Sequence, residues 1–312
     1  MIRIGVINID TSHPLAFAKK MMEEDRARYV AIYNDSFRED DEVEAFIRTF
    51  GLEKRCESVD ELAECVDIGF IQGCDWDKHL SYAEPFIKRG KPVFVDKPIV
   101  GNMADIAKLE AYTANGGVIL GSSSVRYCKE ICEFLAIPVE ERGEIVSVYG
   151  TSGVDEFNYG VHIVEAFGGL LGTGAKSCQF VSEASVGGKT CETYSVIYEN
   201  GVTATYALFL GTWQPFTITI QTTKKTYVLQ IDSSKLYVAL LERIFTYMES
   251  GENTLASMDE LIESIKIMLA GKISRETNKQ AVALSDIPSD YTGYDGKAFA
   301  DGYAASASKM YL

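Results

Sequence analysis

Two residues combine a reactive side chain with a place in the sequence that suits chemistry, Lys97 and His162. Lys97 follows the apolar run at 92–95, so it lies at the carboxyl end of a predicted strand, where open parallel sheets hold their ligands. His162 lies in a predicted helix over residues 159–171, two residues after Gly160, which allows a close approach. An ammonium group lowers the pKa of a neighbouring hydroxyl group, and an imidazole can take up the proton and return it. The alternatives are a solvated lysine beside a turn and a core histidine bonded to a backbone carbonyl.

The elements around Lys97 alternate between apolar strands and amphipathic helices. We expect strands at 2–9, 29–33, 66–71 and 92–95, and helices at 14–24, 41–50, 59–64 and 78–89. A helix at 103–115 and a short strand at 118–120 follow them. Continuous apolar strands that alternate with helices indicate a parallel sheet covered on both faces. The sequence therefore predicts an α/β fold whose N-terminal domain, residues 1–122, is a Rossmann-like, doubly wound parallel sheet.

The pattern changes after residue 140. We expect longer strands at 144–150, 175–185, 190–198, 202–210, 217–222 and 225–231, with clear helices at 159–171 and 257–270. Asn200-Gly201 between alternating apolar residues is a strong signal for a hairpin. Residues 123–312 are therefore predicted to form an α+β domain with a large open, mostly antiparallel sheet.

Two motifs carry a resemblance to a known family. Asp96-Lys97-Pro98 resembles the Glu-Lys-Pro signature of the Gfo/Idh/MocA oxidoreductases, with Asp in place of Glu. The stretch 158–165, Asn-Tyr-Gly-Val-His-Ile-Val-Glu, resembles the family's Asp-x-Gly-x-His-x-x-Asp helix. His79 also follows the strand that ends at residue 71, where the family often has a histidine before the helix that leads to the lysine motif. Together the motifs cover most of the chain in the expected order.

The resemblance implies roles for these residues. Lys97 would contact both the substrate hydroxyl and the cofactor ribose, His162 would be the acid and base for the alcohol proton, and His79 would lie at the cofactor. Asn158 stands where many members of the family carry an Asp. An amide can orient a hydroxyl group but cannot take a proton, so either Lys97 and His162 manage proton transfer or a carboxylate at 155–156 substitutes.

The phosphate-binding loop departs from the family pattern. The three glycine positions of Gly-x-Gly-x-x-Gly align with Asn8, Asp10 and His13. Side chains of Thr11, Ser12 and His13 could still donate hydrogen bonds to a phosphate. Asp10, however, would place a carboxylate where a pyrophosphate belongs, satisfying the helix end and repelling the ligand. Either the chain binds its dinucleotide in a modified way, or it has lost the cofactor; simple helix capping by 10–12 needs no ligand.

The end of the second predicted strand bears on the choice of nucleotide. Asp35 lies near the position that hydrogen-bonds an adenosine ribose in NAD-preferring proteins, which favours NAD. Strict alignment puts Asn34 there, and Asn-Asp-Ser is also an ordinary turn. Arg38 nearby leaves NADP binding possible.

The substrate contacts are predicted in the second half of the chain. Arg126 and Tyr127 follow a Ser run where the family often supplies substrate contacts, and Tyr159 neighbours the His162 helix. Trp213 could stack on a sugar-like ligand or pack at a subunit contact. The aromatic tail, residues 291–311, is expected to be a packed surface or an oligomer contact.

Composition narrows the class of partner. A formal net charge of -15 disfavours nucleic acid and anionic membranes, and no apolar stretch is long enough to span a membrane. The seven Cys residues include no Cys-x-x-Cys pair, so we expect buried thiols rather than disulfides or a metal site. We expect a cytoplasmic protein that binds a small molecule. The resemblance implies that the second domain, residues 123–312, binds substrate and mediates oligomerisation, because open sheet faces commonly pair between subunits in this family. We therefore expect a homodimer or homotetramer.

The resemblance therefore implies a nicotinamide-dependent oxidoreductase, with NAD or NADP as cofactor. Its substrate would be a secondary alcohol of a sugar, polyol or related small hydroxylated compound. The alternative is a non-redox binding or regulatory protein of the same fold that has lost the dinucleotide. A third possibility is a lyase or isomerase that uses a tightly held cofactor transiently.

Overall fold

The computed structural model describes residues 1–121 and 123–309, which form two compact units. Among these residues, the first unit contains 1–121, 240–258 and 295–309, and the second contains 123–239 and 259–294. The chain thus returns to the first unit twice after leaving it. The boundary predicted at residue 122 falls outside the described residues, as does Tyr311 of the aromatic tail.

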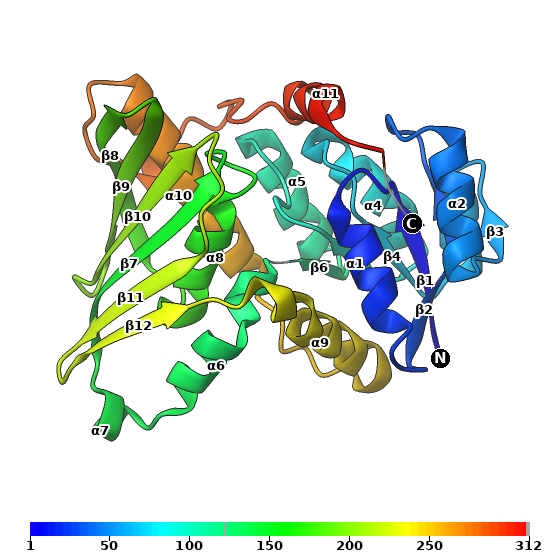
Figure 1. Ribbon diagram of the computed structural model, residues 1–312, viewed down its shortest axis with the longest axis horizontal. Coiled ribbons are helices and arrows are strands. Elements are labelled where there is room, and N and C mark those ends of the chain that lie inside the picture. Colours follow the sequence, from blue (N-terminus) through cyan, green and yellow to red (C-terminus); the bar gives the residue numbers. More distant parts are fainter. Residues whose placement is uncertain (122, 310–312) are drawn as a thin grey trace. The chain divides into compact units, whose positions relative to one another are not determined.

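The first unit is built on a parallel six-stranded sheet, as the sequence predicts (Figure 1). Its order is β3-β2-β1-β4-β5-β6, so the direction of winding reverses between β1 and β4. The strands are β1 (Ile2–Ile7), β2 (Ala27–Tyr33), β3 (Lys54–Arg55), β4 (Ile68–Ile71), β5 (Val93–Val95) and β6 (Ile119–Gly121). A reversal of this kind opens a crevice at the carboxyl ends of the strands, where such sheets bind ligands.

Helices with clear start signals connect these strands. They are α1 (Ser12–Met21), α2 (Asp40–Phe50), α3 (Val59–Cys65), α4 (His79–Lys88) and α5 (Met103–Ala114), with a 3₁₀ turn η1 (Trp76–Lys78) before α4. Ser58 caps α3 by accepting the Glu61 backbone N–H at 3.1 Å. Phe17, Phe70 and Phe94 pack with ring centroids 5.0–6.2 Å apart in the core. Each such ring contributes roughly 1.5–3 kcal/mol through burial.

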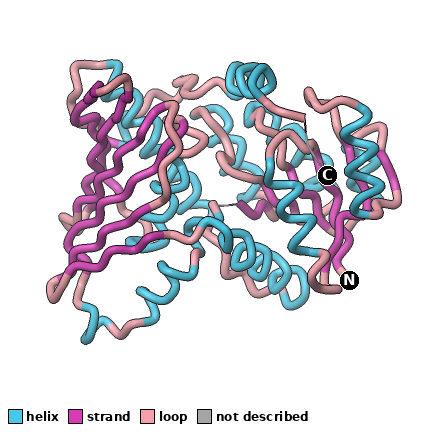
Figure 2. The backbone as a smooth tube through the Cα atoms, viewed as in Figure 1, coloured by secondary structure: helices cyan, strands magenta, loops and turns pink. Residues whose placement is uncertain are grey.

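The second unit contains a seven-stranded sheet in the order β12-β11-β7-β10-β9-β8-β13 (Figure 2). Only the pair β7 and β10 is parallel among the pairings described, so the sheet is mostly antiparallel as predicted. The hairpin at Asn200-Gly201 joins β9 to β10. The strands are β7 (Ile145–Val154), β8 (Ala175–Val186), β9 (Lys189–Tyr198), β10 (Thr203–Leu210), β11 (Thr217–Thr222), β12 (Thr226–Gln230) and β13 (Val282–Ala283).

Helix α8 lies against one face of this sheet because a glycine leaves room for it. A Cβ atom at Gly150 of β7 would lie 2.6 Å from Ile163 Cγ2 and 3.1 Å from the Phe167 ring. α8 begins at Gly160 and carries His162, so this packing sets the depth of the histidine. The helices of this unit are α6 (Lys129–Ala136), α7 (Val139–Arg142), α8 (Gly160–Leu171) and α10 (Met258–Glu276), with 3₁₀ turns η2 (Ser124–Tyr127), η3 (Ser233–Lys235) and η4 (Leu284–Asp286).

Two helices that the sequence pattern did not predict complete the first unit. α9 (Leu236–Ser250) begins in the second unit, and its later part docks on the first, where Arg26 pairs with Glu242 at 2.6 Å and Glu249 at 2.8 Å. α11 (Gly296–Ser306) belongs wholly to the first unit.

All seven cysteines are free thiols. Four are buried, but Cys65, Cys132 and Cys191 are only half-buried, so the prediction of buried thiols is wrong for these three. Each of the three lies on an element with one face toward solvent. Among the described residues, no helix combines the length and the apolar character that crossing a membrane requires.

Candidate functional site

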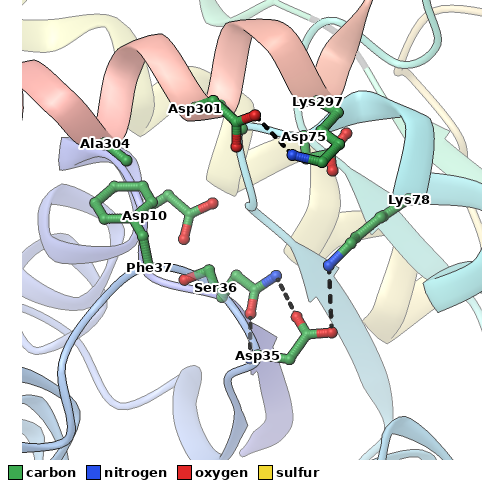
Figure 3. A pocket seen from close by; sticks show the side chains of 11 residues that line it. Asp10, Asp35, Ser36, Phe37, Asp75, Lys78, Lys297, Asp301 and Ala304 are labelled. Atoms are coloured by element: carbon green, nitrogen blue, oxygen red, sulfur yellow. Dashed lines mark hydrogen bonds and ion pairs between the residues drawn. The ribbon is translucent and has the colours of Figure 1, made fainter.

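A cavity of about 210 Å³ lies at the carboxyl edge of the parallel sheet, beside the reversal between β1 and β4 (Figure 3). Its walls come from three strand exits and one helix. They are Asn8 and Asp10 after β1, Asp35, Ser36 and Phe37 after β2, Asp75 and Lys78 before α4, and Lys297, Ala300, Asp301 and Ala304 of α11. All of these residues belong to the first unit.

Asn8 makes the turn that a glycine would make in a phosphate-binding loop. Its φ is +62°, in the left-handed region that Asn tolerates better than most residues. Its side chain exchanges two hydrogen bonds with Asp35: Asn8 Nδ2 donates to Asp35 Oδ1 at 3.2 Å, and the Asp35 backbone N–H donates to Asn8 Oδ1 at 3.0 Å. Tyr82 Oη also donates to Asp35 Oδ1 at 2.6 Å. Burial, reinforced by Asp35, raises the pKa of Tyr82 and keeps this phenol a donor. These hydrogen bonds therefore hold the Asp35 carboxylate against the turn at Asn8.

Asp10 is buried at the mouth of the first helix but does not cap it. Thr11 is the cap of α1 and accepts the His13 backbone N–H at 3.2 Å, while Ser12 begins the helix at the surface. Asp10 Oδ2 instead accepts the Cys74 backbone N–H at 2.8 Å, which corrects the expectation that it satisfies the helix end. Asp10 Oδ1 is buried and has no hydrogen-bond partner among the described residues. A carboxylate oxygen in this state is costly unless something outside the chain donates to it.

His13 and Asp96 form an ion pair beside Lys97. His13 Nδ1 lies 2.6 Å from Asp96 Oδ2, and the Lys97 backbone N–H donates to Asp96 Oδ1 at 2.8 Å. Burial alone would raise the pKa of Asp96, but the charges and hydrogen bonds of His13 and Lys97 outweigh it and lower the pKa. The Lys97–Pro98 peptide bond is cis, and the Lys97 side chain is half-buried. The Asp96 carboxylate thus orients the backbone at Lys97 and the His13 ring together.

Arg38, the residue that left NADP binding possible in the sequence, forms hydrogen bonds within the protein. Its Nε and Nη2 donate to the Asp10 carbonyl at 3.2 and 2.7 Å, and its Nη1 donates to Glu42 and to the Ser308 carbonyl at 2.9 Å each. Lys78 Nζ lies 3.6 Å from Asp35 Oδ2. Asn34 accepts a hydrogen bond from Ser36 Oγ at 3.2 Å, as a turn residue does, so Asp35 is the residue that faces the cavity.

His79 lies in the core of the first unit rather than along the wall of the cavity. Its Nδ1 is 3.1 Å from the Ile99 carbonyl and its Nε2 is 3.0 Å from the Gly73 carbonyl. The ring therefore joins the segment after β4 to the segment that follows Lys97. A cofactor contact for His79 stays a prediction.

His162 is buried in the second unit, where a serine and a glutamate define its surroundings. Ser123 Oγ lies 2.5 Å from His162 Nδ1, and the Ser123 backbone N–H donates to Glu165 Oε2 at 2.8 Å. Glu165 is buried, so its carboxylate faces the interior of the unit and not the surface of the helix. The His162 ring packs edge-on against Tyr159 and Phe216, with centroids 5.9 and 5.2 Å away. These contacts fix the orientation of the imidazole.

The loop that leads into α8 holds Asn158 and Tyr159. It begins at Val154, whose φ of +73° is a strained conformation for a β-branched residue. Glu156 Oε2 accepts from Arg275 at 2.6 Å, and Phe157 stacks on Tyr294 with centroids 4.0 Å apart. Strain of this kind persists where the surroundings determine the backbone, as they do here.

The remaining predicted substrate residues have three different environments. The Arg126 guanidinium is buried, pairs with Glu260 and donates to the Glu165 carbonyl at 3.3 Å. Tyr127 is buried in the same turn, η2. Trp213 is 64% exposed in the loop between β10 and β11, so stacking on a ligand and packing on another subunit both stay open. Substrate contacts by these residues and Tyr159 stay predictions.

A family match explains the order of these elements. Residues 2–123 match the model of the oxidoreductase family with an NAD-binding Rossmann fold, Gfo/Idh/MocA. The six-stranded sheet therefore carries a match to the Gfo/Idh/MocA oxidoreductases, the family that the lysine motif resembles. The match covers the six-stranded sheet and ends at Ser123, the partner of His162.

Other proteins are similar to this chain over a longer range. The trans-1,2-dihydrobenzene-1,2-diol dehydrogenase of Oryctolagus cuniculus is 27% identical over 217 residues, which are 64% of this chain and 64% of that protein. The match therefore spans less than two thirds of that relative. A probable dehydrogenase from Thermotoga maritima superposes with a TM-score of 0.79 at 17% identity, over 92% of this chain and 100% of the other. The scyllo-inositol dehydrogenase of Lactobacillus casei, with NAD(H) and scyllo-inositol, gives 0.78 at 15%, over 91% and 99%. These two likenesses show the fold.

The structure thus groups the predicted residues within each unit. Asn8, Asp10 and Asp35 face one cavity, and His13 joins Lys97 through Asp96. Several contributing groups were not singled out from the sequence, among them Tyr82, the Ser123 hydroxyl, and the inner face of α11. Ser123 lies in the Ser run that was noticed. Tyr82 contacts Asp35, and α11 lines the cavity, only through tertiary packing.

Proposed function

We propose that the chain is a nicotinamide-dependent oxidoreductase that acts on a secondary alcohol of a sugar, polyol or related small hydroxylated compound. The observation that carries this proposal is Lys97 itself. It follows β5 at the ligand-binding edge of a sheet whose residues 2–123 match an NAD-binding family, and its backbone is held by the buried Asp96–His13 pair. The diol dehydrogenase among the relatives supports the substrate class.

In the proposed reaction, the protein manages the proton of the alcohol. The Lys97 ammonium would hydrogen-bond the substrate hydroxyl and lower its pKa. The His162 imidazole, oriented by Ser123, would take that proton and return it in the reverse direction. Asn158 would orient the hydroxyl group, since an amide can donate and accept hydrogen bonds but does not titrate.

The dinucleotide, when bound, would accept or donate the hydride. The crevice fits its nucleoside end, because Asn8 supplies the glycine-like turn and Asp35 faces the cavity from the end of β2. Asp35 favours NAD, since its carboxylate accepts hydrogen bonds from ribose hydroxyls and repels a 2′-phosphate. The engagement of Arg38 with Asp10, Glu42 and Ser308 supports the same preference.

Calorimetric titration with NAD, NADH, NADP and NADPH tests the cofactor, and a screen of polyols and sugars then tests turnover. We expect micromolar binding of NAD or NADH. Lys97→Ala should lower kcat by roughly 10²- to 10⁴-fold, as the loss of a proton-handling group does. Lys108→Ala, at an exposed helix position, is the matched control. If none of the four dinucleotides binds and Lys97→Ala changes no ligand interaction, the proposal is wrong.

A non-redox binding or regulatory role is the second candidate, and the buried Asp10 favours it. Its carboxylate stands where the second glycine of a phosphate loop would be and is 2% exposed. Asp10→Asn keeps the shape of the side chain and removes its charge. If the oxidoreductase proposal holds, this variant should bind NAD more tightly by up to roughly tenfold, because the helix start then attracts the pyrophosphate without opposition. Binding that appears only in the variant would indicate that the native crevice serves another ligand.

We also propose a homodimer or homotetramer formed through the open face of the seven-stranded sheet. Tyr149, Ile197 and Val228 lie on the face opposite α8 by the register of the strands, and they are 42%, 40% and 61% exposed. An apolar face of this kind is typical of subunit contacts. Light scattering of the protein measures the oligomeric state.

A further inference from the structure

One wall of the cavity comes from α11, a helix far along the chain from the other walls. Lys297, Ala300, Asp301 and Ala304 line the cavity, with the spacing i, i+3, i+4, i+7 that places side chains on one face of a helix. Figure 3 shows α11 spanning the cavity on the side opposite Asp35. The helix therefore presents one continuous face to the space where the strands of the sheet end.

The first turn of α11 is fastened to the segment before α4. Asp77 Oδ2 accepts the backbone N–H groups of Gly296 and Lys297 at 2.8 and 3.2 Å. A Cβ atom at Gly296 would lie 2.8 Å from the backbone nitrogens of Trp76 and Asp77, so only glycine allows this approach. Phe299 covers the buried Trp76 ring at a centroid distance of 5.0 Å.

The last turns of α11 are fastened to the segment after β2. Tyr303 packs against Phe37 at 6.2 Å, and Arg38 Nη1 donates to the Ser308 carbonyl at 2.9 Å. Lys309 pairs with Asp41 at 3.0 Å. The helix is thus attached to both strand exits that flank the cavity, although Gly296 is its only buried residue among those described.

The size and chemistry of the cavity select a class of ligand. Its volume of about 210 Å³ is below the roughly 300–1,000 Å³ of clefts that hold a drug-sized molecule, so it suits one fragment of a dinucleotide. Two of the four α11 residues in the wall, Ala300 and Ala304, are alanines, whose small side chains leave room for a ring. The wall carries four aspartates against two lysines, a formal charge of -2, which favours a fragment rich in hydrogen-bond donors over a phosphate monoester.

We propose that α11 is part of the nucleotide site, where Ala300 and Ala304 form the outer wall of the pocket for the adenosine end of the dinucleotide. This inference rests on the proposed function. What it adds is the contribution of a C-terminal helix, and with it two positions whose side-chain size controls adenosine binding. Lys297 and Asp301, the other two α11 residues of the wall, pair with each other at 2.6 Å.

Leucine substitutions along α11 test the proposal, since the helix supplies its own controls. Ala300→Leu and Ala304→Leu fill the cavity, whereas Ala298→Leu and Ala305→Leu place the same side chain at exposed positions that do not line it. Leucine and alanine have similar helix propensity, so all four variants should fold. Each full-length variant is titrated with NADH, ADP-ribose, adenosine and nicotinamide mononucleotide, and thermal unfolding confirms that it is folded.

We expect Ala300→Leu and Ala304→Leu to weaken the binding of NADH, ADP-ribose and adenosine by at least roughly tenfold, which corresponds to about 1.4 kcal/mol of binding free energy. Nicotinamide mononucleotide should bind as it does to the unsubstituted protein, and the exposed variants should behave like that protein throughout. Equal binding by all four variants, or an equal loss in all four, would overturn the proposal.

The probes also separate this inference from the proposed function. Unchanged NADH binding by the cavity variants would refute the role of α11 and leave the oxidoreductase intact. Adenosine binding that depends on Ala300 and Ala304, without binding of any dinucleotide, would support the pocket and refute the redox function. If no probe binds the unsubstituted protein, both proposals are wrong.

Discussion

The carboxyl groups around the crevice differ in what stabilises their charge. Asp96 is buried, but His13 and Lys97 compensate for its burial and lower its pKa. Burial raises the pKa of Asp77, and the backbone N–H groups of Lys297 and Gly296 offset this only in part. Asp10 leaves one buried oxygen without a partner among the described residues. The free-energy cost of burying a charged carboxylate therefore differs among these three aspartates of one unit, because their neighbours differ.

The lowered pKa of Asp96 predicts a contribution to stability that acid removes. The contribution is fully present above the pKa of an unfolded aspartate, about 3.9, and is lost as the pH falls below that value through the lower pKa of the folded state. The difference in unfolding free energy between the native protein and Asp96→Asn should therefore shrink between pH 5 and roughly pH 3. Urea unfolding at several pH values measures it.

The exposed substitution Asp290→Asn serves as the control for this experiment. Its difference from the native protein should change little over the same pH range. A difference for Asp96→Asn that stays constant as the pH falls would mean that the His13–Asp96 pair does not stabilise the folded protein.

At the level of the elements, glycines decide how closely two elements can pack. Gly150 lets α8 approach β7 until Ile163 and Phe167 occupy the space of a missing Cβ atom. Gly302 lies within α11 with nothing within 4 Å of its Cβ position. Glycine is thus required by the packing at Gly150. At Gly302 it only lowers the stability of the helix, since glycine costs a helix roughly 0.5–1 kcal/mol relative to alanine.

Alanine substitutions at the two glycines should therefore have opposite effects. Gly150→Ala should lower the free energy of unfolding by about 1–3 kcal/mol, because α8 must shift to accommodate the new methyl group. Gly302→Ala should raise the stability of α11 by up to about 1 kcal/mol. Urea denaturation measures the first change, and hydrogen exchange of the α11 amides measures the second. A neutral Gly150→Ala would show that the sheet and α8 separate easily.

The sequence predicted most strands and helices well. Besides the short α6 and α7, it missed α9 and α11, and the omission of these two has a physical explanation. A half-buried helix such as α2 shows an apolar stripe in its sequence. α11 buries only Gly296 among its described residues and consists largely of small residues, so it has no stripe. α9 begins with a continuous apolar run at residues 236–241, and such a run is compatible with a helix or a strand.

Local motifs alone were enough to single out Lys97 and His162 as candidate site residues. Contacts between residues that lie far apart in the sequence could not be predicted. The Asp96–His13 pair joins positions 83 residues apart, and Tyr82 reaches Asp35 across 47 residues. Nothing in the local pattern of these residues specifies such pairings, because they depend on the order of the strands. The contact of Asp10 with Cys74 corrects the cap assigned to it for the same reason.

For the molecule as a whole, the dominant electrostatic property is its formal charge of -15 at neutral pH. Repulsion among like charges opposes the compact state, and salt screens it, with a Debye length of about 10 Å at 0.1 M. We expect the unfolding temperature at pH 7.5 to rise when sodium chloride is increased from low to physiological concentration. Differential scanning calorimetry measures this shift.

The pH provides the control for this effect of salt. At pH 5, close to the isoelectric point of about 4.7, the net charge nearly vanishes and the salt-dependent gain should vanish with it. An equal gain at both pH values would assign the effect to specific ion binding rather than to the overall charge.

The return of the chain to its first unit has a consequence for synthesis on the ribosome. The six-stranded sheet emerges first, but the later part of α9 and all of α11 follow only after most of the second unit has been made. Until then, the nascent sheet exposes Trp76 and Phe37, the rings that Phe299 and Tyr303 later cover. A chain interrupted before residue 296 would carry the sheet without the α11 residues that line the cavity. In the proposed nucleotide site, ligand binding would then require that translation has passed through α11.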